Sequence, residues 1–357
     1  ISLILKMKED KKLDKPVLVI CPTTLMGNWM KELQMFAPSL DAVIYHGAER
    51  QLDLKHDVIL TTYAIMRIDV DELKKNNWGM IIVDEAQNIK NPDTAQTLAV
   101  KMLKSDIKIA MTGTPVENRL TELWSIFDFI NQGYLGSLRE FQKSYAIPIE
   151  RFKENSRAAK LKMSVSPFVL RRLKTDKHVI TDLPEKMVLN DYCYLSKPQA
   201  VLYEKTLNEM MEKISGFTGI NRRGNIFKLI TALKQICNHP YQFLKGGEMS
   251  KEMSGKMDKC ISTVQSILDN GEKTLIFTQY KEMGDILCKV ISDECNTEPL
   301  FFHGSLTVTQ REELINRFQT DADAKVMILS LKAGGTGLNL TSATNVIHYD
   351  LWWNPAV

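Results

Sequence analysis

Short apolar runs that each end in a small or polar cluster constrain the fold of this chain most strongly. Eight such runs occur, at 17–21, 58–60, 80–83, 109–111, 274–277, 300–302, 326–329 and 345–349. Runs that are apolar throughout are typical of strands buried on both faces, as in parallel sheets. Stretches with helical periodicity separate them, at 25–37, 94–104, 282–292 and 309–319. This alternation predicts an α/β fold with right-handed crossovers.

The polar clusters follow the carboxyl ends of these runs. In parallel sheets, ligands bind beyond the carboxyl ends of the strands. Because the runs form two groups, at 17–111 and 274–349, we expect two sheets with a line of binding loops on each. The stretch between them, about 116–260, has a mainly helical pattern.

Composition excludes several classes of protein. Hydrophobic content of 44% and charged content of 25% are ordinary for a globular chain. No apolar run approaches the roughly 18 residues of a membrane span, so we expect no membrane partner. The six scattered cysteines predict reduced thiols in a cytosolic protein. Cys237 and His239 suggest zinc, but no second ligand pair has the spacing to complete a site.

A local basic run is hidden by the net charge of only +3. Residues 151–177 contain nine Lys and Arg, among them Arg171 and Arg172, against Glu154 and Asp176. Such a run is either a solvated helix face or a patch that binds nucleic acid, and charge alone leaves both interpretations open.

The stretch MIIVDEAQNIKNP places two adjacent carboxylates, Asp84 and Glu85, directly after a buried run. Burying two unpaired carboxylates is costly, so either the strand end reaches solvent or a positive partner lies there. An aspartate at such a position can hold Mg²⁺ through its water shell. A neighbouring glutamate can polarise the water that attacks a γ-phosphate.

Several stretches in a fixed order carry a resemblance to a known family. They are VLVICPTTLMGNWMKEL, ILTTYAIM, IIVDEAQNIKN, TGTPVENRLTELWSIFDFI, FVLRRLKTD, LKQICNHP, TLIFTQY, FFHGS, LSLKAGGTGLNL and DLWWNP. Through nearly its whole length the chain resembles the SWI/SNF-type DNA-dependent ATPases, a branch of helicase superfamily two. The form with Gln87 in place of histidine resembles bacterial members.

The resemblance implies two RecA-like lobes of the P-loop NTPase type, with parallel sheets and helical insertions, that clasp ATP and track duplex DNA. The first lobe would span 1–195 with an insertion at about 116–180, and the second 196–357 with an insertion at about 196–250. It implies ATP and Mg²⁺ as cofactors and double-stranded DNA as a partner. RNA polymerase or another DNA-bound protein would be the target of a cytoplasmic, nucleoid-associated bacterial protein.

The family's residue roles transfer position by position. Asp84 would hold Mg²⁺ and Glu85 would activate water, while Gln87, Thr112, Gly113 and Thr114 would couple the nucleotide state to the lobes. Gly335 and Gly337 would bring the backbone close to nucleotide and DNA, because glycine permits close approach. Expected DNA contacts are Thr23, Thr24, Thr61, Thr62, Arg171, Arg172, Gln279, His303, Ser330, Lys332, Trp352 and Trp353.

Two alternatives stay open at these positions. Each threonine could equally be a strand-end cap with no ligand role. Of the adjacent Trp352 and Trp353, one could be a core residue and one partly exposed, or an indole could contact the DNA strand or the lobe interface.

Two expected elements are absent from these 357 residues. No G-x-x-x-x-G-K-[ST] phosphate loop occurs, and Gly255-Lys256 is followed by Met257. The arginine-bearing motif expected after DLWWNP is also missing. We therefore expect a piece of a longer protein that hydrolyses little ATP alone. A strand-separating DNA or RNA helicase and a non-catalytic DNA-binding fragment are the alternatives, and FVLRRLKTD and ICNHP argue against the former.

Overall fold

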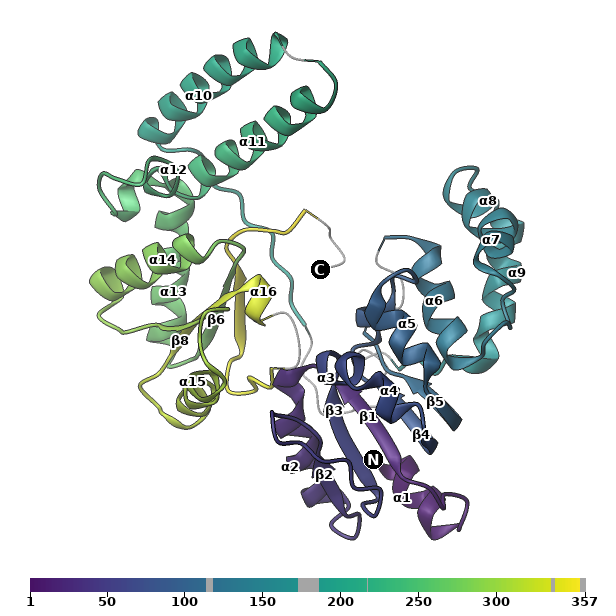
Figure 1. Ribbon diagram of the computed structural model, residues 1–357. Coiled ribbons are helices and arrows are strands. Elements are labelled where there is room, and N and C mark those ends of the chain that lie inside the picture. The colour runs from purple at the N-terminus through teal and green to yellow at the C-terminus, as the bar shows by residue number, and fades with distance from the viewer. Residues whose placement is uncertain (114–117, 173–185, 217, 335–337, 354–357) are drawn as a thin grey trace. The chain divides into compact units, whose positions relative to one another are not determined.

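A computed structural model describes residues 1–113, 118–172, 186–216, 218–334 and 338–353. The chain divides into two compact units, residues 1–186 and 187–355, each with its own parallel sheet (Figure 1).

The first unit is built on a five-stranded parallel sheet of order β2-β3-β1-β4-β5. Its strands are β1 (Val17–Cys21), β2 (Ala42–Ile44), β3 (Val58–Thr62), β4 (Asn77–Val83) and β5 (Lys104–Ala110). Successive side chains point to opposite faces, and both faces of the central strands are buried. Leu18 and Ile81 pack on one face, and Val17 and Met80 on the other. This two-sided burial is why these runs are apolar at every position.

Helices cover both faces of the first sheet. They are α1 (Ser2–Glu9), α2 (Met26–Phe36), α3 (Tyr63–Ile68), α4 (Val70–Leu73), α5 (Ala95–Met102) and α6 (Leu120–Ile130), with short turns η1 (Thr23–Leu25) and η2 (Ala86–Ile89). Residues of α1 and α2 pack on one face, and residues of α3, α5 and α6 on the other.

A separate helical cluster follows α6 in the first unit. It contains α7 (Leu138–Phe141), η3 (Gln142–Ala146), α8 (Ile147–Glu150), α9 (Asn155–Val165) and η4 (Ser166–Phe168). Trp124 of α6 packs there with Phe141 and Leu161, while Phe129 of the same helix lies in the sheet core. Helix α6 therefore joins the helical cluster to the sheet.

The second unit has a four-stranded parallel sheet of order β7-β8-β6-β9. Its strands are β6 (Thr274–Thr278), β7 (Leu300–Phe302), β8 (Val326–Ser330) and β9 (Asn345–His348). Its helices are α10 (Lys197–Ser215), α11 (Gly219–Asn238), α12 (Pro240–Leu244), α13 (Gly255–Asp269), α14 (Lys281–Cys295), α15 (Val308–Thr320) and α16 (Leu331–Gly334), with η5 (Lys251–Met253). The long helices α10 and α11 lie side by side as a hairpin (Figure 1).

The predicted fold class is confirmed. All eight predicted runs form parallel strands, and α2, α5, α14 and α15 occupy the four stretches of helical periodicity. Strand β2 was not predicted, because its three residues lie at the sheet edge and none of them is fully buried. Within the described ranges, no helix is both long and apolar enough to cross a membrane.

Candidate active site

The two adjacent carboxylates lie at the carboxyl end of β4, and both are half-buried. The backbone N–H of Asp84 continues the sheet by donating to the Ile20 carbonyl (2.9 Å). Asp84 Oδ2 accepts from the indole Nε1–H of Trp29 (2.9 Å), and Oδ1 accepts from the N–H of Glu85 (2.9 Å). These donors orient the carboxylate but carry no formal charge, so its negative charge remains available to a cation.

Trp29 was not among the residues that sequence reasoning selected. It lies in α2, which begins at the same edge of the sheet, one turn after the end of β1. No local feature of the sequence singled it out, because Trp29 meets Asp84 only through packing between segments 55 residues apart.

The chain turns sharply at Glu85, which adopts a left-handed conformation with φ 52° and ψ 55°. The Tyr63 hydroxyl donates to the Asp84 carbonyl (2.6 Å), and Ala86 N–H donates to the Met111 carbonyl (2.8 Å). These bonds hold the turn from the segments that follow β3 and β5, so Asp84 and Glu85 do not continue the alternation of β4.

A chain of side-chain hydrogen bonds joins three of the predicted residues. Gln87 Nε2 donates to Glu85 Oε2 (2.6 Å), and Thr112 Oγ1 donates to Gln87 Oε1 (2.8 Å). Thr112 follows β5, so the amide of Gln87 connects the ends of two adjacent strands. The structure thus brings Asp84, Glu85, Gln87 and Thr112 together, and Gly113 lies exposed next to Thr112.

The four threonines predicted to contact DNA fall into two kinds. Thr23 and Thr24 are exposed in η1, directly beyond β1. Thr61 and Thr62 are buried, and both hydroxyls are used within the lobe. Thr61 Oγ1 donates to the Tyr45 carbonyl (3.0 Å), and Thr62 Oγ1 accepts from Ile65 N–H (3.2 Å) as the N-cap of α3. These contacts support the strand-end alternative for Thr61 and Thr62.

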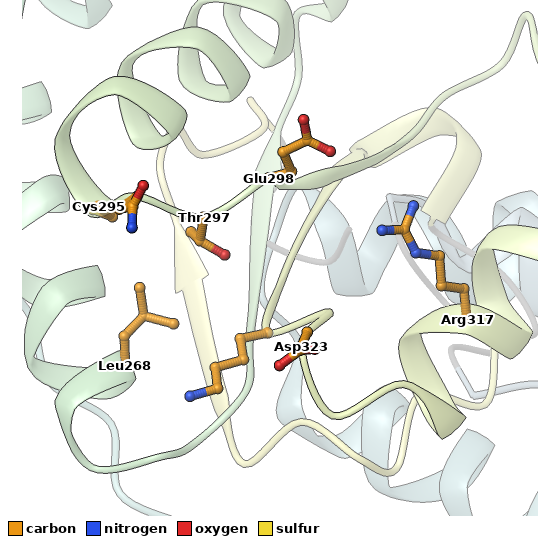
Figure 2. A pocket seen from close by; sticks show the side chains of 8 residues that line it. Leu268, Cys295, Thr297, Glu298, Arg317 and Asp323 are labelled. Carbon is orange, nitrogen blue, oxygen red and sulfur yellow. The ribbon is translucent and has the colours of Figure 1, made fainter.

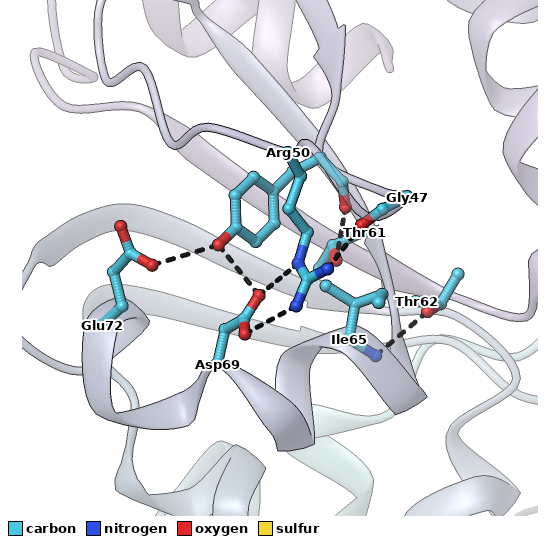
Figure 3. A network of polar contacts seen from close by, with 8 residues as sticks. Gly47, Arg50, Thr61, Thr62, Ile65, Asp69 and Glu72 are labelled. Atoms are coloured by element: carbon cyan, nitrogen blue, oxygen red, sulfur yellow. Dashed lines mark hydrogen bonds and ion pairs between the residues drawn. The ribbon is translucent and has the colours of Figure 1, made fainter.

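Figure 3 shows the polar network that covers Thr61. The Arg50 guanidinium donates to both carboxylate oxygens of Asp69 (2.5 and 2.8 Å) and to the Gly47 carbonyl. The Tyr45 hydroxyl donates to Asp69 (2.9 Å) and contacts Glu72 (3.2 Å). The hydrogen bonds from Arg50 lower the pKa of the Asp69 carboxyl. The network fixes the segment after β2 over the carboxyl end of β3.

Asp350 is the centre of the corresponding edge in the second unit. It follows β9, is 4% exposed, and accepts three hydrogen bonds. The donors are Gln279 N–H (2.6 Å), Thr278 Oγ1 (2.8 Å) and Asn238 Nδ2 (2.9 Å). Asp350 and Asn238 were not among the predicted site residues, although both lie in stretches that carried the family resemblance.

The remaining predicted DNA contacts of the second unit lie on several elements. Gln279 Nε2 donates to the Leu351 carbonyl (3.1 Å), and Ser330 ends β8. The His303 ring packs on Phe301 (4.8 Å between centroids). Trp352 is half-buried and Trp353 is 54% exposed, which leaves both tryptophan interpretations open.

Three of the other predicted residues can be located on the fold. Arg171 and Arg172 are exposed after η4, and Lys332 lies in α16. Thr114, Gly335 and Gly337 lie outside the described residues.

The donor set around Asp84 fits a magnesium ion that keeps most of its waters. Within the described part of the chain, no group of three or more His, Cys, Asp or Glu side chains could hold a metal. Mg²⁺ is commonly bound through one or two carboxylates, with water and substrate phosphates completing its octahedron. Asp84 suits that arrangement, because among the described residues only two donors, the Trp29 indole and the Glu85 N–H, contact its carboxylate.

The cysteines and His239 of the ICNHP stretch were considered as metal ligands from the sequence. All six cysteines are free. His239 Nε2 contacts the Ser250 carbonyl (3.0 Å) and its Nδ1 accepts from Tyr241 N–H (3.1 Å), so both ring nitrogens are engaged. Burial lowers the pKa of His239. Both ring nitrogens of His239 therefore already have partners within the second unit.

A pocket of about 410 Å³ lies in the second unit, away from the polar strand ends (Figure 2). Of the residues that line it, Glu298 lies two residues before the start of β7 and Lys325 directly precedes β8. Ligands of parallel sheets bind at the opposite, carboxyl edge, so the position of this pocket gives it no part in the site.

A family model described as the SNF2-related domain matches residues 1–242, and one described as the helicase conserved C-terminal domain matches residues 255–357. YwqA of Bacillus subtilis, which is named as an ATP-dependent helicase/translocase, is 43% identical over all of this chain. The human DNA excision repair protein ERCC-6 is 31% identical over 96% of it.

These relatives are much longer than the matched region. The chain covers 40% of YwqA and 25% of ERCC-6. Among solved structures, the Sulfolobus solfataricus SWI2/SNF2 ATPase core in complex with double-stranded DNA is 44% identical. It matches with a TM-score of 0.52, covering 99% of this chain and 75% of that one.

Proposed function

This chain belongs to the SNF2-related family, and from that membership we propose that the protein carrying it uses ATP to translocate on double-stranded DNA. Members of the family are ATP-dependent, and a solved structure of a similar ATPase core contains duplex DNA. The observation that supports the proposal most directly is the connected set Asp84, Glu85, Gln87 and Thr112 at one edge of the first sheet.

The geometry of this set suits the hydrolysis of a phosphoanhydride. We assign Asp84 to hold Mg²⁺ through water, where the bound ion would neutralise charge on the phosphates. We assign Glu85 as the group that orients and polarises the attacking water. The 2.6 Å hydrogen bond from Gln87 holds the Glu85 carboxylate in one orientation.

The hydrogen bonds that link Glu85 to Thr112, after the end of β5, provide a route for coupling between the nucleotide site and that strand end. Gln87 contacts Glu85 with its amide nitrogen and Thr112 with its amide oxygen. Loss of either partner leaves one end of that amide unpaired, so the positions of Glu85 and Thr112 are linked. We propose that this link relates the state of the nucleotide to the loop after β5, which contains Gly113 and Thr114.

Contacts to phosphates would give binding without sequence preference. The accessible candidates for contacts to DNA are exposed. They are Thr23 and Thr24 at the first sheet, Arg171 and Arg172 after η4, and Trp353 in the second unit. We further propose that RNA polymerase or another DNA-bound protein is the target, in the cytoplasm and on the nucleoid.

The test uses the native protein that contains this sequence. We expect ATP hydrolysis that duplex DNA stimulates, and displacement of a triplex-forming strand without separation of the duplex. Preferential stimulation by single-stranded RNA, or duplex unwinding, would favour a strand-separating helicase. Duplex binding with no hydrolysis at any DNA concentration would favour a non-catalytic DNA-binding protein.

A further inference from the structure

Two residues of the LKQICNHP stretch at the end of α11, Lys234 and Asn238, contact the segment after β9. Lys234 Nζ donates to the Leu351 carbonyl (2.9 Å) and lies 4.0 Å from the centroid of the Trp353 ring. Four residues later, Asn238 Nδ2 donates to Asp350 (2.9 Å), and the Asn238 carbonyl accepts from the Tyr349 hydroxyl (2.8 Å). Helix α11 therefore holds residues 349–353 through side chains one helical turn apart.

The base of this arrangement is buried and polar. Asn238 is 1% exposed, and its Oδ1 accepts from Lys256 Nζ (3.0 Å). Gln199 of α10 donates to the carbonyls of Ile236 and Cys237 (2.8 and 3.1 Å). Both helices of the hairpin are thus attached at the point where α11 meets Asp350.

The positions of residues 351–353, at the end of this segment, depend on Lys234. The Leu351 side chain is 69% exposed and Trp353 is 54% exposed, so few apolar contacts hold them. Lys234 contacts the segment at the Leu351 carbonyl and at the Trp353 ring, and Gln279 also donates to that carbonyl (3.1 Å). An ammonium over an indole face attracts the ring electrostatically and fixes its orientation.

We propose that Lys234 is a positioning residue that presents the exposed face of Trp353 to duplex DNA, which links the α10–α11 hairpin to DNA engagement by the second lobe. This inference rests on the proposed function for its ligand. Lys234 itself need not contact a phosphate, because its ammonium is occupied by the Leu351 carbonyl and the indole ring.

The first experiment asks whether Lys234 holds Trp353. Acrylamide quenching is measured for the native protein and for Lys234→Met, each with and without Trp353→Phe, so that the difference reports Trp353 alone. We expect Lys234→Met to make Trp353 clearly more quenchable and Lys228→Met, an exposed lysine on the same helix, to leave it unchanged. Unchanged quenching in Lys234→Met would overturn the proposal.

The second experiment asks whether that contact matters for DNA. The Kd for duplex DNA should rise about tenfold in Lys234→Met, which corresponds to a loss of about 1.4 kcal/mol in binding free energy. Lys234→Arg should recover most of the affinity, because a guanidinium can donate to the same carbonyl and stack on the same ring. A Kd equal to wild type in Lys234→Met would overturn the proposal, whereas a wild-type protein that binds no duplex would instead overturn the proposed function.

A salt titration separates positioning from direct phosphate contact. A lysine that neutralises a phosphate contributes about one unit to the slope of log K against log salt. We expect Lys234→Met to keep the wild-type slope, and a slope reduced by that amount would make Lys234 a phosphate contact and overturn the proposal. If Lys234→Met does not fold, Trp353→Leu with Lys234 intact should give the same loss of affinity, and wild-type affinity in that variant would equally overturn it.

Discussion

The left-handed backbone at Glu85 predicts that substitutions at this position change the stability of the protein and its ATPase activity in different ways. Glu85 has φ 52° and ψ 55°, a region that costs a residue with a Cβ roughly 1–2 kcal/mol. Glycine avoids that cost but loses about 0.5–1 kcal/mol through its freedom in the unfolded chain. Replacing Glu85 by Gly or by Ala removes the same carboxylate and the same hydrogen bond to Gln87. The two variants therefore differ mainly in backbone preference.

From these terms we expect Glu85→Gly to be more stable than Glu85→Ala by about 1 kcal/mol. For a unit of this size, that difference corresponds to a Tm difference of about 2–4 °C. Differential scanning calorimetry of the 357-residue chain measures it, with the transition of the first unit compared between variants. An alanine variant as stable as the glycine variant would refute the strain argument.

Activity should not follow stability in this series. In the native protein, Glu85→Gly, Glu85→Ala and Glu85→Gln should all lower kcat by about 10²–10⁴, because each removes the group that polarises water. Glu85→Gln keeps the shape of the side chain and should still bind Mg-ATP. Turnover near wild type in Glu85→Gln would mean that the acidic pair is an ordinary strand end.

Asp84→Asn should raise the Mg²⁺ concentration needed for half-maximal ATPase activity, and an unchanged Mg²⁺ dependence would remove its metal role. Asp350→Ala removes the acceptor of three donors, two of them on buried residues, and should destabilise the second unit by about 3 kcal/mol in urea unfolding, whereas a loss below about 1 kcal/mol would show that water replaces the carboxylate. Joint replacement of Arg171 and Arg172 by Gln should weaken duplex binding equally across sequences and flatten its salt dependence, and an unchanged slope would assign them to a solvated face. The 357-residue chain alone should hydrolyse no ATP above background with duplex DNA, because no phosphate-loop sequence occurs in it, and robust turnover would contradict this expectation.

The parallel strands and the acidic edge of the first sheet were predictable from the sequence. A strand buried on both faces must be apolar at every position, so runs such as 17–21 and 80–83 could be identified without tertiary information. Asp84, Glu85 and Gln87 are neighbours along the chain, and Thr112 follows the adjacent strand. Their proximity therefore follows from strand order and the shared carboxyl edge.

Which of several similar residues are accessible depends on tertiary packing. Two pairs of adjacent threonines, Thr23-Thr24 and Thr61-Thr62, follow or end apolar runs of the same kind. The first pair is exposed, whereas the second pair is buried. The difference arises because Tyr45 and Arg50, from the segment after β2, cover the end of β3. In the same way, Trp29 reaches Asp84 across 55 residues of sequence and Lys234 reaches Leu351 across 117. Such partners are selected by packing between distant segments, and no local pattern of hydrophobicity or charge encodes which of them will meet.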